Sequence, residues 1–314
     1  MPDRTRLGAF LVLLGSIVLA PVTTVRAGEE AHVPLEVEVV TFNIRYGTAN
    51  DGANAWPHRR EAVLDYLDDC DADFIGLQEA LSMQSDLVKA RLEGDYDMII
   101  RTREKRDGEG EATPLLYRRD RWRLDPERHG TFWLSETPDV PASRSWQTSL
   151  PRIATWGRFE DRSTGRPVWV FNTHFDHRSA AARLGAARLI ASRIARLVPA
   201  QEPVIVMGDL NATPESPPLA TLLSGGGRPE AALVDAWRIS NPAPAPECTF
   251  NGWGPGLDGR RIDHVLVRKG AEVKRSSIVR RFVEGRPISD HWPVDATVTF
   301  PATVTTETGQ DDGS

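Results

Sequence analysis

The feature of this sequence that most restricts its fold is a set of short apolar segments that carry acidic, amide or imidazole side chains at one end. One such segment, residues 203–207, reads Pro-Val-Ile-Val-Met and runs directly into Gly-Asp-Leu-Asn. On an extended chain Asp209 and Asn211 point to the same side and Leu210 points to the other. A turn would also account for this one pair, because Asp and Asn both favour turns.

The same pattern recurs at five further positions along the chain. The polar residues concerned are Asn43, Gln78-Glu79, His174, Asp263 and Asp290-His291. Turns do not require Glu or His, and clustered polar side chains are costly to bury unless they bind something. Carboxylates and amides without sulfur ligands suit a hard divalent cation such as Mg²⁺ or Mn²⁺. The imidazoles beside such an ion would suit the oxygens of a phosphate.

Between these positions, helical and strand-like patterns alternate. The apolar periodicity predicts helices at 58–69, 82–93, 179–198 and 217–223, and strands at 35–42, 74–78, 95–101, 113–118, 153–160, 167–173, 203–208, 262–267, 272–283 and 293–300. Residues 58–60, His-Arg-Arg, are interpreted as a solvated helix face. No linker or repeat divides the pattern, so we expect one α/β or α+β domain over residues 28–302.

The two ends of the chain differ from this pattern. Arg4 and Arg6 precede an apolar run at residues 7–20, which a small-residue cleavage site follows. These features predict a secretory signal peptide over residues 1–27, because the run is shorter than the ~20 residues of a membrane span. We therefore expect an exported protein, periplasmic or extracellular, without stable membrane insertion after cleavage. The polar tail at residues 303–314 is predicted to be disordered.

Net charge and cysteine content restrict the function further. The chain carries a net charge of −6, and removing residues 1–27 leaves 35 basic and 43 acidic residues, a net charge of −8. This balance argues against a protein held to nucleic acid by bulk charge, although it allows a local basic groove. Cys70 and Cys248 could pair in an exported protein, and the sequence leaves that pairing open. Two cysteines make neither a disulfide scaffold nor a cysteine-based zinc site.

Taken together, the polar strand ends resemble the motifs of the endonuclease/exonuclease/phosphatase superfamily. The matching series, in order, is Thr41-Phe42-Asn43, Gly76-Leu77-Gln78-Glu79, Asn172-Thr173-His174, Gly208-Asp209-Leu210-Asn211, Arg261-Ile262-Asp263 and Ser289-Asp290-His291. The resemblance spans residues 36–300 and is closest to a bacterial, often exported branch. It implies an α/β fold, a four-layer sandwich of two mostly antiparallel β-sheets flanked by helices. It also places the site at one end of that sandwich.

The resemblance implies a metal-binding group within this site. Glu79 would be the main ligand of the divalent ion. Asn43 and Asp290 would belong to the same network of metal and water. The ion would act as a Lewis acid on the phosphoryl oxygen or on the leaving group.

The resemblance also implies catalytic roles for five residues. Asp209 matches the general base that draws a proton from the attacking water, and Asn211 would hold that water or a phosphate oxygen. His174 and His291 would donate to the phosphate as negative charge develops on its oxygens. Asp263 would accept a hydrogen bond from His291 and fix its tautomer.

Five further residues are candidates for substrate binding. Arg152 would clamp a phosphate, or else form a surface ion pair. Asp176 and His177 match the branch signature and would either bind substrate or buttress the site. Arg45 directly follows the first motif. Trp253, in a Gly-rich loop, would offer a platform for a base or a sugar, or else pack inside an Ω-loop.

We therefore expect an exported, metal-dependent phosphoesterase that uses activated water to hydrolyse phosphate mono- or diesters of a small or sugar-linked substrate, acting as a monomer. A secreted DNA or RNA nuclease is the first alternative, but the chain has an acidic net charge and lacks basic runs interleaved with aromatic residues. A sphingomyelinase-like phosphodiesterase would need an exposed apolar hairpin, and none is evident. A non-catalytic binding module is disfavoured, because the acidic and histidine positions are all present.

Overall fold

The computed structural model describes residues 33–242, 247–256 and 259–302. The signal peptide predicted for residues 1–27 and the tail predicted for residues 303–314 lie outside the described residues. In the described part of the chain, no helix has both the length and the apolar character that crossing a membrane requires.

The described residues form two large β-sheets of six strands each. The first sheet contains, in spatial order, β13 (Glu272–Ile278), β16 (Val294–Phe300), β1 (Leu35–Asn43), β2 (Phe74–Gln78), β6 (Leu115–Arg118) and β4 (Tyr96–Ile99). The second contains β11 (Leu233–Asp235), β12 (Asp263–Arg268), β10 (Val204–Asp209), β9 (Pro167–His174), β8 (Ile153–Asp161) and β7 (Trp122–Trp133). Each sheet has one parallel pair, β1–β2 or β9–β10, and its other pairs are antiparallel.

Smaller elements complete the fold. The helices are α1 (Trp56–Asp69), α2 (Ser82–Leu92), α3 (Ala180–Leu197), α4 (Pro217–Leu223) and α5 (Ala236–Ser240), with 3₁₀ turns at Gly52–Asn54, Gly225–Gly227 and Pro229–Ala231. Two small sheets pair β3 (Ala80–Leu81) with β5 (Glu111–Ala112), and β14 (Phe282–Val283) with β15 (Arg286–Pro287).

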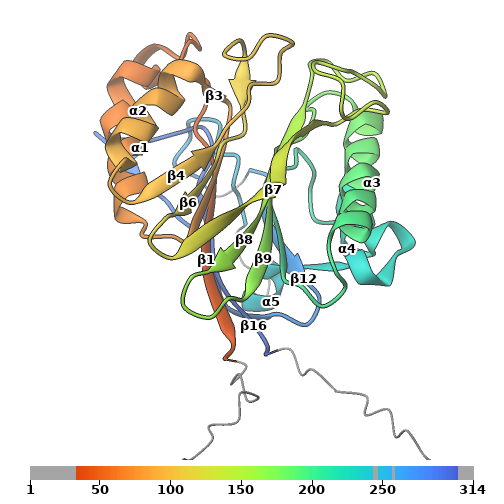
Figure 1. The fold of residues 1–314 in the computed structure, drawn as a ribbon. Helices are drawn as coiled ribbons and strands as arrows, with labels where there is room; N and C mark the ends of the chain where they lie inside the picture. Colours follow the sequence, from red (N-terminus) through yellow and green to blue (C-terminus); the bar gives the residue numbers. More distant parts are fainter. Residues whose placement is uncertain (1–32, 243–246, 257–258, 303–314) are drawn as a thin grey trace, which may run out of the picture. The chain divides into compact units, whose positions relative to one another are not determined.

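The two large sheets face each other, and helices cover their outer faces (Figure 1). Val39 of the first sheet and Val170 of the second belong to one buried cluster between the sheets. Val63 of α1 packs with Phe42 on the outer side of the first sheet, and α3 and α4 cover the second sheet. The four-layer sandwich predicted from the sequence is thereby confirmed.

The pairing registers bring the polar strand ends together. Asn43 pairs with Gln78 across the parallel strands β1 and β2. In the second sheet Asp209 lies between His174 on β9 and Asp263 on β12. The end of each parallel pair therefore presents its polar residues at the same edge of the sandwich.

Some elements differ from the sequence-based prediction. The strand β7, at the edge of the second sheet, was not predicted, nor were β11 and α5. The middle of β7 is exposed, and its register shifts between Leu124 and His129, so it shows no regular alternation of apolar and polar residues. The predicted strand at 272–283 is instead two strands, β13 and β14.

The cysteines do not form the disulfide that the sequence left open. Cys70 is a free thiol whose Sγ donates to the carbonyl oxygen of Leu67. The Sγ of Cys248 is directed to the carbonyl oxygen of Phe250.

A buried histidine on β12 of the second sheet is expected to make the free energy of unfolding depend on pH. His264 is fully buried, with Nδ1 3.0 Å from Nη1 of Arg261 and Nε2 2.8 Å from the carbonyl oxygen of Ala212. Burial, together with the charge of Arg261, lowers the pKa of His264 to about 4. Between pH 6.5 and pH 4 the unfolded chain therefore binds the proton more readily than the folded chain does.

As pH falls from 6.5 to 4, His264 is expected to reduce the free energy of unfolding by roughly 1.4 kcal/mol per pH unit. The variant His264→Gln can make both hydrogen bonds but cannot titrate. Urea unfolding at pH 7 and pH 5 should show a larger loss of stability for the wild type than for this variant. Equal losses in the two proteins would contradict the prediction.

Candidate active site

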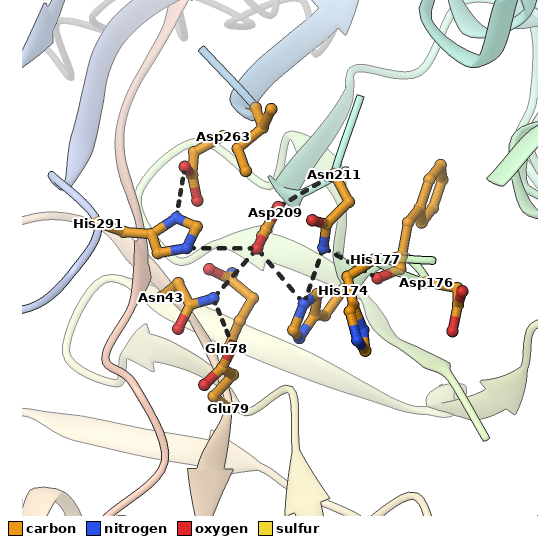
Figure 2. Close-up of polar contacts among 12 residues, drawn as sticks. Asn43, Gln78, Glu79, His174, Asp176, His177, Asp209, Asn211, Asp263 and His291 are labelled. Carbon is orange, nitrogen blue, oxygen red and sulfur yellow. Dashed lines mark hydrogen bonds and ion pairs between the residues drawn. The ribbon is translucent and has the colours of Figure 1, made fainter. Parts of the chain in front are cut away.

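A buried carboxylate lies at the centre of the converging strand ends (Figure 2). Asp209 is 1% exposed. Its Oδ2 accepts a hydrogen bond from Nδ2 of Asn43 at 3.1 Å and lies 3.4 Å from Nε2 of His174 and 3.8 Å from Nε2 of His291. Its Oδ1 accepts from the backbone N–H of Asn211 at 2.8 Å. Segments that are distant in the sequence therefore share one acidic centre.

The backbone around this centre takes unusual conformations. Gly208 has a φ of +146°, and a Cβ there would lie 1.9 Å from the carbonyl oxygen of Thr173, so this close approach of β9 and β10 requires glycine. Arg45, Glu79 and Asn211 also have positive φ, at 57°, 59° and 46°. Non-glycine residues adopt this region at a cost, and they do so most often at functional sites.

The two histidines beside Asp209 hold different charge states. Burial lowers the pKa of His174 well below its usual value, and the charge of Arg152 lowers it further. Burial also opposes protonation of His291, but the carboxylates of Asp263 and Asp209 outweigh it and raise the pKa of His291 well above the usual value. The Nδ1 of His291 lies 2.8 Å from Oδ2 of Asp263. Near neutral pH, His174 is therefore neutral and His291 is an imidazolium.

The pKa of the central carboxylate lies near neutral pH. Burial raises the pKa of Asp209 to about 7, and the negative charge of Asp263 adds to this effect. A carboxyl group in this range can release and take up a proton at physiological pH.

A second acidic group lies on the first sheet, beside Asp209. The Oε1 of Glu79 accepts from Nδ2 of Asn43, and its Oε2 accepts from the backbone N–H of Tyr46, each at 3.1 Å. The Oδ2 of Asp290 lies 3.7 Å from Nη1 of Arg45. Burial raises the pKa of Asp290, and the charge of Glu79 adds to it. Two carboxylates that repel each other, next to an amide, form an all-oxygen donor set that fits a hard divalent cation.

A third group of residues could also hold a metal ion. Asp209, Asp263 and His291 each offer one ligand atom, and these atoms lie within 4.8 Å of one another. The Nδ1 of His291 faces Oδ2 of Asp263, and the two carboxylates raise the pKa of the ring. Without an ion, this group is therefore a carboxylate–imidazolium–carboxylate array, and a metal bound there would have to displace a ring proton.

These groups border a cleft of about 520 Å³. Four arginines line it: Arg45, Arg152, Arg183 and Arg260. Arg183 lies in the first turn of α3, directly after the His174 motif, and Arg260 precedes Asp263. The sequence analysis did not select Arg183 or Arg260. Their positions near the His174 and Asp263 motifs could have indicated them. The cleft therefore combines four arginines with four carboxylates, those of Glu79, Glu111, Asp209 and Asp290.

The structure does not bring every predicted substrate-binding residue into this cleft. The carboxylate of Asp176 is buried and accepts hydrogen bonds from Ser149 and from the backbone N–H of Ser179, so it buttresses the loops around α3. Trp253 does not line the cleft. Phe250, from the same loop, does line it and packs edge-on against His291 at a centroid distance of 5.1 Å.

Arg59 was expected on a solvated face, but it is 2% exposed. Its Nη1 donates to the carbonyl oxygens of Ile44 and Ile288, its Nη2 to that of Arg45, and its Nε to that of Asn54. One guanidinium therefore ties the loop after β1 to the segment that leads into Asp290. Helical periodicity could not reveal these carbonyls, because they come from loops.

Replacing Arg59 is expected to destabilise the protein strongly. In Arg59→Met, the buried carbonyl oxygens lose their donor, at a cost of about 3 kcal/mol or more in the free energy of unfolding. The matched control is Arg60→Met, because Arg60 is exposed and forms its ion pair with the neighbouring Glu61. Its effect should stay within about 0.5 kcal/mol. Denaturant unfolding measures both changes, and equal midpoints for Arg59→Met and the wild type would refute the assigned role.

Comparison with known proteins places these observations in context. The model of the Endonuclease/Exonuclease/phosphatase family matches residues 40–291. The endonuclease/exonuclease/phosphatase structure from Bacteroides vulgatus is 33% identical to this chain, with a TM-score of 0.76 over 84% of this chain and 98% of that one.

Two further structures are similar to this chain. The mannosyl-6-phosphatase Bt3783 from Bacteroides thetaiotaomicron VPI-5482 is 31% identical, with a TM-score of 0.74 over 83% of this chain and 99% of that one. The D. rerio TDP2, complexed with a single-strand DNA product, is 17% identical, with a TM-score of 0.65 over 84% of this chain and 98% of that one. The latter similarity demonstrates a shared fold only.

Proposed function

Since the chain belongs to the endonuclease/exonuclease/phosphatase family, we propose that it is an exported, divalent-metal-dependent phosphoesterase that hydrolyses a small, sugar-linked phosphate ester. Members of this family are metal-dependent hydrolases of phosphoesters. The observation that carries the proposal is the position of Asp209, a buried carboxylate between a neutral and a charged imidazole, beside a second pair of carboxylates.

In this proposal Asp209 is the general base. Its pKa of about 7 lets it take a proton from water near neutral pH. The backbone N–H of Asn211 and the amide of Asn43 hold the two oxygens of the carboxylate, so the base is fixed in orientation. A water molecule held against it would attack the phosphorus opposite the leaving group.

The histidines stabilise the charge that develops on the phosphate. The imidazolium of His291 is oriented by Asp263 and directs Nε2 toward the space beside Asp209. His174 approaches the same space from the opposite side, as Figure 2 shows. Fixed donors of this kind, in a buried site, lower the barrier by electrostatic stabilisation.

The all-oxygen group would hold the metal ion. Glu79 and Asp290, with Asn43 beside them, would bind Mg²⁺ or Mn²⁺, which supplies Lewis-acid stabilisation of the phosphoryl oxygens. Asn43 donates hydrogen bonds to both Glu79 and Asp209. It therefore holds the proposed metal ligand and the proposed base at a constant spacing.

The shape and charge of the cleft support a small substrate. Its volume of about 520 Å³ lies within the range of small-molecule sites, roughly 300–1,000 Å³. The arginines that line the cleft can neutralise the charge of one phosphate group. The net charge of the chain, −6, opposes the binding of a long polyanion. The 31% identical structure from Bacteroides thetaiotaomicron is a mannosyl-6-phosphatase, which favours a sugar phosphate.

A panel of phosphoesters tests the substrate class. The protein lacking residues 1–27 would be assayed in Mg²⁺ and in Mn²⁺ with mannose 6-phosphate, other sugar phosphates, p-nitrophenyl phosphate, bis-p-nitrophenyl phosphate, RNA, plasmid DNA and sphingomyelin. Sugar phosphates should be hydrolysed fastest. Faster cleavage of polynucleotides would favour the nuclease alternative, and faster cleavage of sphingomyelin the lipid alternative. A protein with all site residues intact that hydrolyses none of these would support a binding role.

Export is a separate part of the proposal. A full-length chain produced in a bacterium is expected to appear outside the cytoplasm with Gly28 as its first residue, or a residue within a few positions of it. Amino-terminal sequencing of the purified protein measures this directly. A cytoplasmic protein that retains residues 1–27 would contradict it.

A further inference from the structure

Arg152 contacts two histidines at once. It lies directly before β8, is 5% exposed, and lines the cleft. Its Nη1 is 2.9 Å from Nδ1 of His174, and its Nη2 is 3.0 Å from Nδ1 of His177. A guanidinium has five N–H donors and no acceptor, so each Nδ1 must accept a hydrogen bond and carry no proton. Each Nη carries a second N–H, so these two contacts still leave donors for a further acceptor.

We propose that Arg152 is a positioning residue that holds His174 in the tautomer with its proton on Nε2, and that holds His177 through the other Nη atom. In this state His174 offers the cleft a proton donor instead of a lone pair. The effect on hydrolysis rests on the proposed phosphoesterase function, whereas the tautomer itself does not.

One neighbouring group competes with this arrangement. The Nδ2 of Asn211 lies 3.1 Å from Nε2 of His174 and could donate to it in the other tautomer. That amide also donates to the carbonyl oxygen of Phe175. A charged donor forms a hydrogen bond roughly twice as strong as a neutral one, so the contact with Arg152 prevails. A proton on Nδ1 would moreover point directly at a positive charge.

Other contacts hold Arg152 in place and keep His174 neutral. The Nε of Arg152 lies 3.9 Å from Oδ2 of Asp176, whose carboxylate is fixed by the loop at Ser149. Asp176 does not line the cleft, and its carboxylate instead helps to hold the guanidinium of Arg152 in place. Burial and the nearby positive charges both lower the pKa of His174, which opposes a second proton on the ring.

Elsewhere in the described residues, a second histidine has the same arrangement, and there the position of the proton is unambiguous. His264 has Nδ1 3.0 Å from Nη1 of Arg261 and Nε2 2.8 Å from the carbonyl oxygen of Ala212. A carbonyl oxygen can only accept, so the proton of His264 lies on Nε2. His264 therefore provides an internal reference for the state proposed for His174.

For catalysis, this tautomer separates the roles of His174 and Asp209. With its proton on Nε2, His174 faces Oδ2 of Asp209 at 3.4 Å and can instead donate to a phosphate oxygen that enters the cleft. With a lone pair there, it would repel that oxygen. Arg152 thus ensures that the cleft contains one base and two donors.

Nitrogen-15 spectra of the imidazole rings test the proposal without any substrate. The protein would be labelled on its seven histidines and studied in Mg²⁺, with His174 and His177 assigned from His174→Gln and His177→Gln. In the wild type, His174 should show the pattern of His264, with the proton on Nε2. A proton on Nδ1 of His174 in the wild type would overturn the proposal, whatever the variants do.

The variant Arg152→Met removes the charged donors. The His174 signal is expected to move toward the Nδ1–H tautomer, which Asn211 favours, while His264 keeps its pattern and reports an intact fold. His177 is exposed, so water should limit its change. Arg260→Met is the matched control, because it removes another cleft arginine that contacts neither imidazole, and it should leave the His174 tautomer unchanged. An unchanged His174 tautomer in folded Arg152→Met would refute the role.

Activity provides a second, distinguishable readout. If the proposed function is correct, kcat of Arg152→Met should fall roughly 10- to 100-fold, with a smaller change in KM, because a donor to the transition state is lost. A tautomer switch in a protein that hydrolyses nothing would support the inference and remove the proposed function. Hydrolysis combined with an unchanged tautomer in Arg152→Met would support the proposed function and refute the positioning role of Arg152.

Discussion

The variant Asp209→Ala is expected to lose hydrolysis by roughly 10²- to 10⁴-fold, the usual contribution of a general base, without losing stability. The loss follows because the other acidic side chains are committed elsewhere: Glu79 and Asp290 to the proposed cation site, Asp263 to His291, and Glu111 to Arg103. Stability should be kept or increased because burial raises the pKa of Asp209 to about 7. Above pH 4 the unfolded chain ionises this group more readily, so Asp209 costs stability that grows as pH rises to 7.

Initial rates on the best substrate of the panel, together with urea unfolding at pH 7, measure both effects. The control is Asp68→Ala, an exposed aspartate on α1, which should match the wild-type rate. The wild-type rate should also fall as pH drops below about 7, because protonated Asp209 cannot accept a proton from water. A fully active Asp209→Ala enzyme would exclude Asp209 as the base.

Removal of divalent cations is expected to have the second large effect. EDTA should abolish hydrolysis, and Mg²⁺ or Mn²⁺ should restore it. The carboxylates of Glu79 and Asp290 repel each other, and a bound cation would remove that repulsion. The variant Glu79→Gln should need roughly 10- to 100-fold more Mg²⁺ for half-maximal activity, since it loses one of those charges.

A thermal unfolding titration checks the same site without an activity assay. Mg²⁺ should raise the Tm of the wild type by binding the folded state, and the rise should need higher concentrations in Glu79→Gln. Glu61→Gln, at an exposed helix position, should behave like the wild type. Full activity in the presence of chelator would rule out the metal-dependent mechanism.

The sequence contained much of the information on the fold and on the centre of the site. The apolar pattern in residues 35–42 predicted a strand, and the structure places Val39 between the sheets and Phe42 under the helices. The polar strand ends predicted a common site, and the structure brings Asp209 and Asn43 into hydrogen-bond contact. This was possible because strand periodicity and strand ends are local properties that pairing carries to one edge.

Other elements escaped prediction because their environment is not local. The edge strand β7 lacks regular alternation, since much of its length faces solvent on both sides. Trp253 and Phe250 belong to one loop, and no local pattern distinguishes the ring that packs on Arg59 from the ring that lines the cleft.

The sequence by itself determined the helices, most strands and the polar residues at the strand ends, because periodicity and strand ends are set by neighbours in the chain. The four-layer class followed from the resemblance of those strand ends to a known superfamily. Only the tertiary structure decided what the long cationic side chains do. Arg59, expected in solvent, donates to buried carbonyls, and Arg152, expected on a phosphate or in a surface ion pair, donates to two imidazoles. A flexible side chain reaches acceptors on distant segments, and burial then sets the charge state of whatever it contacts.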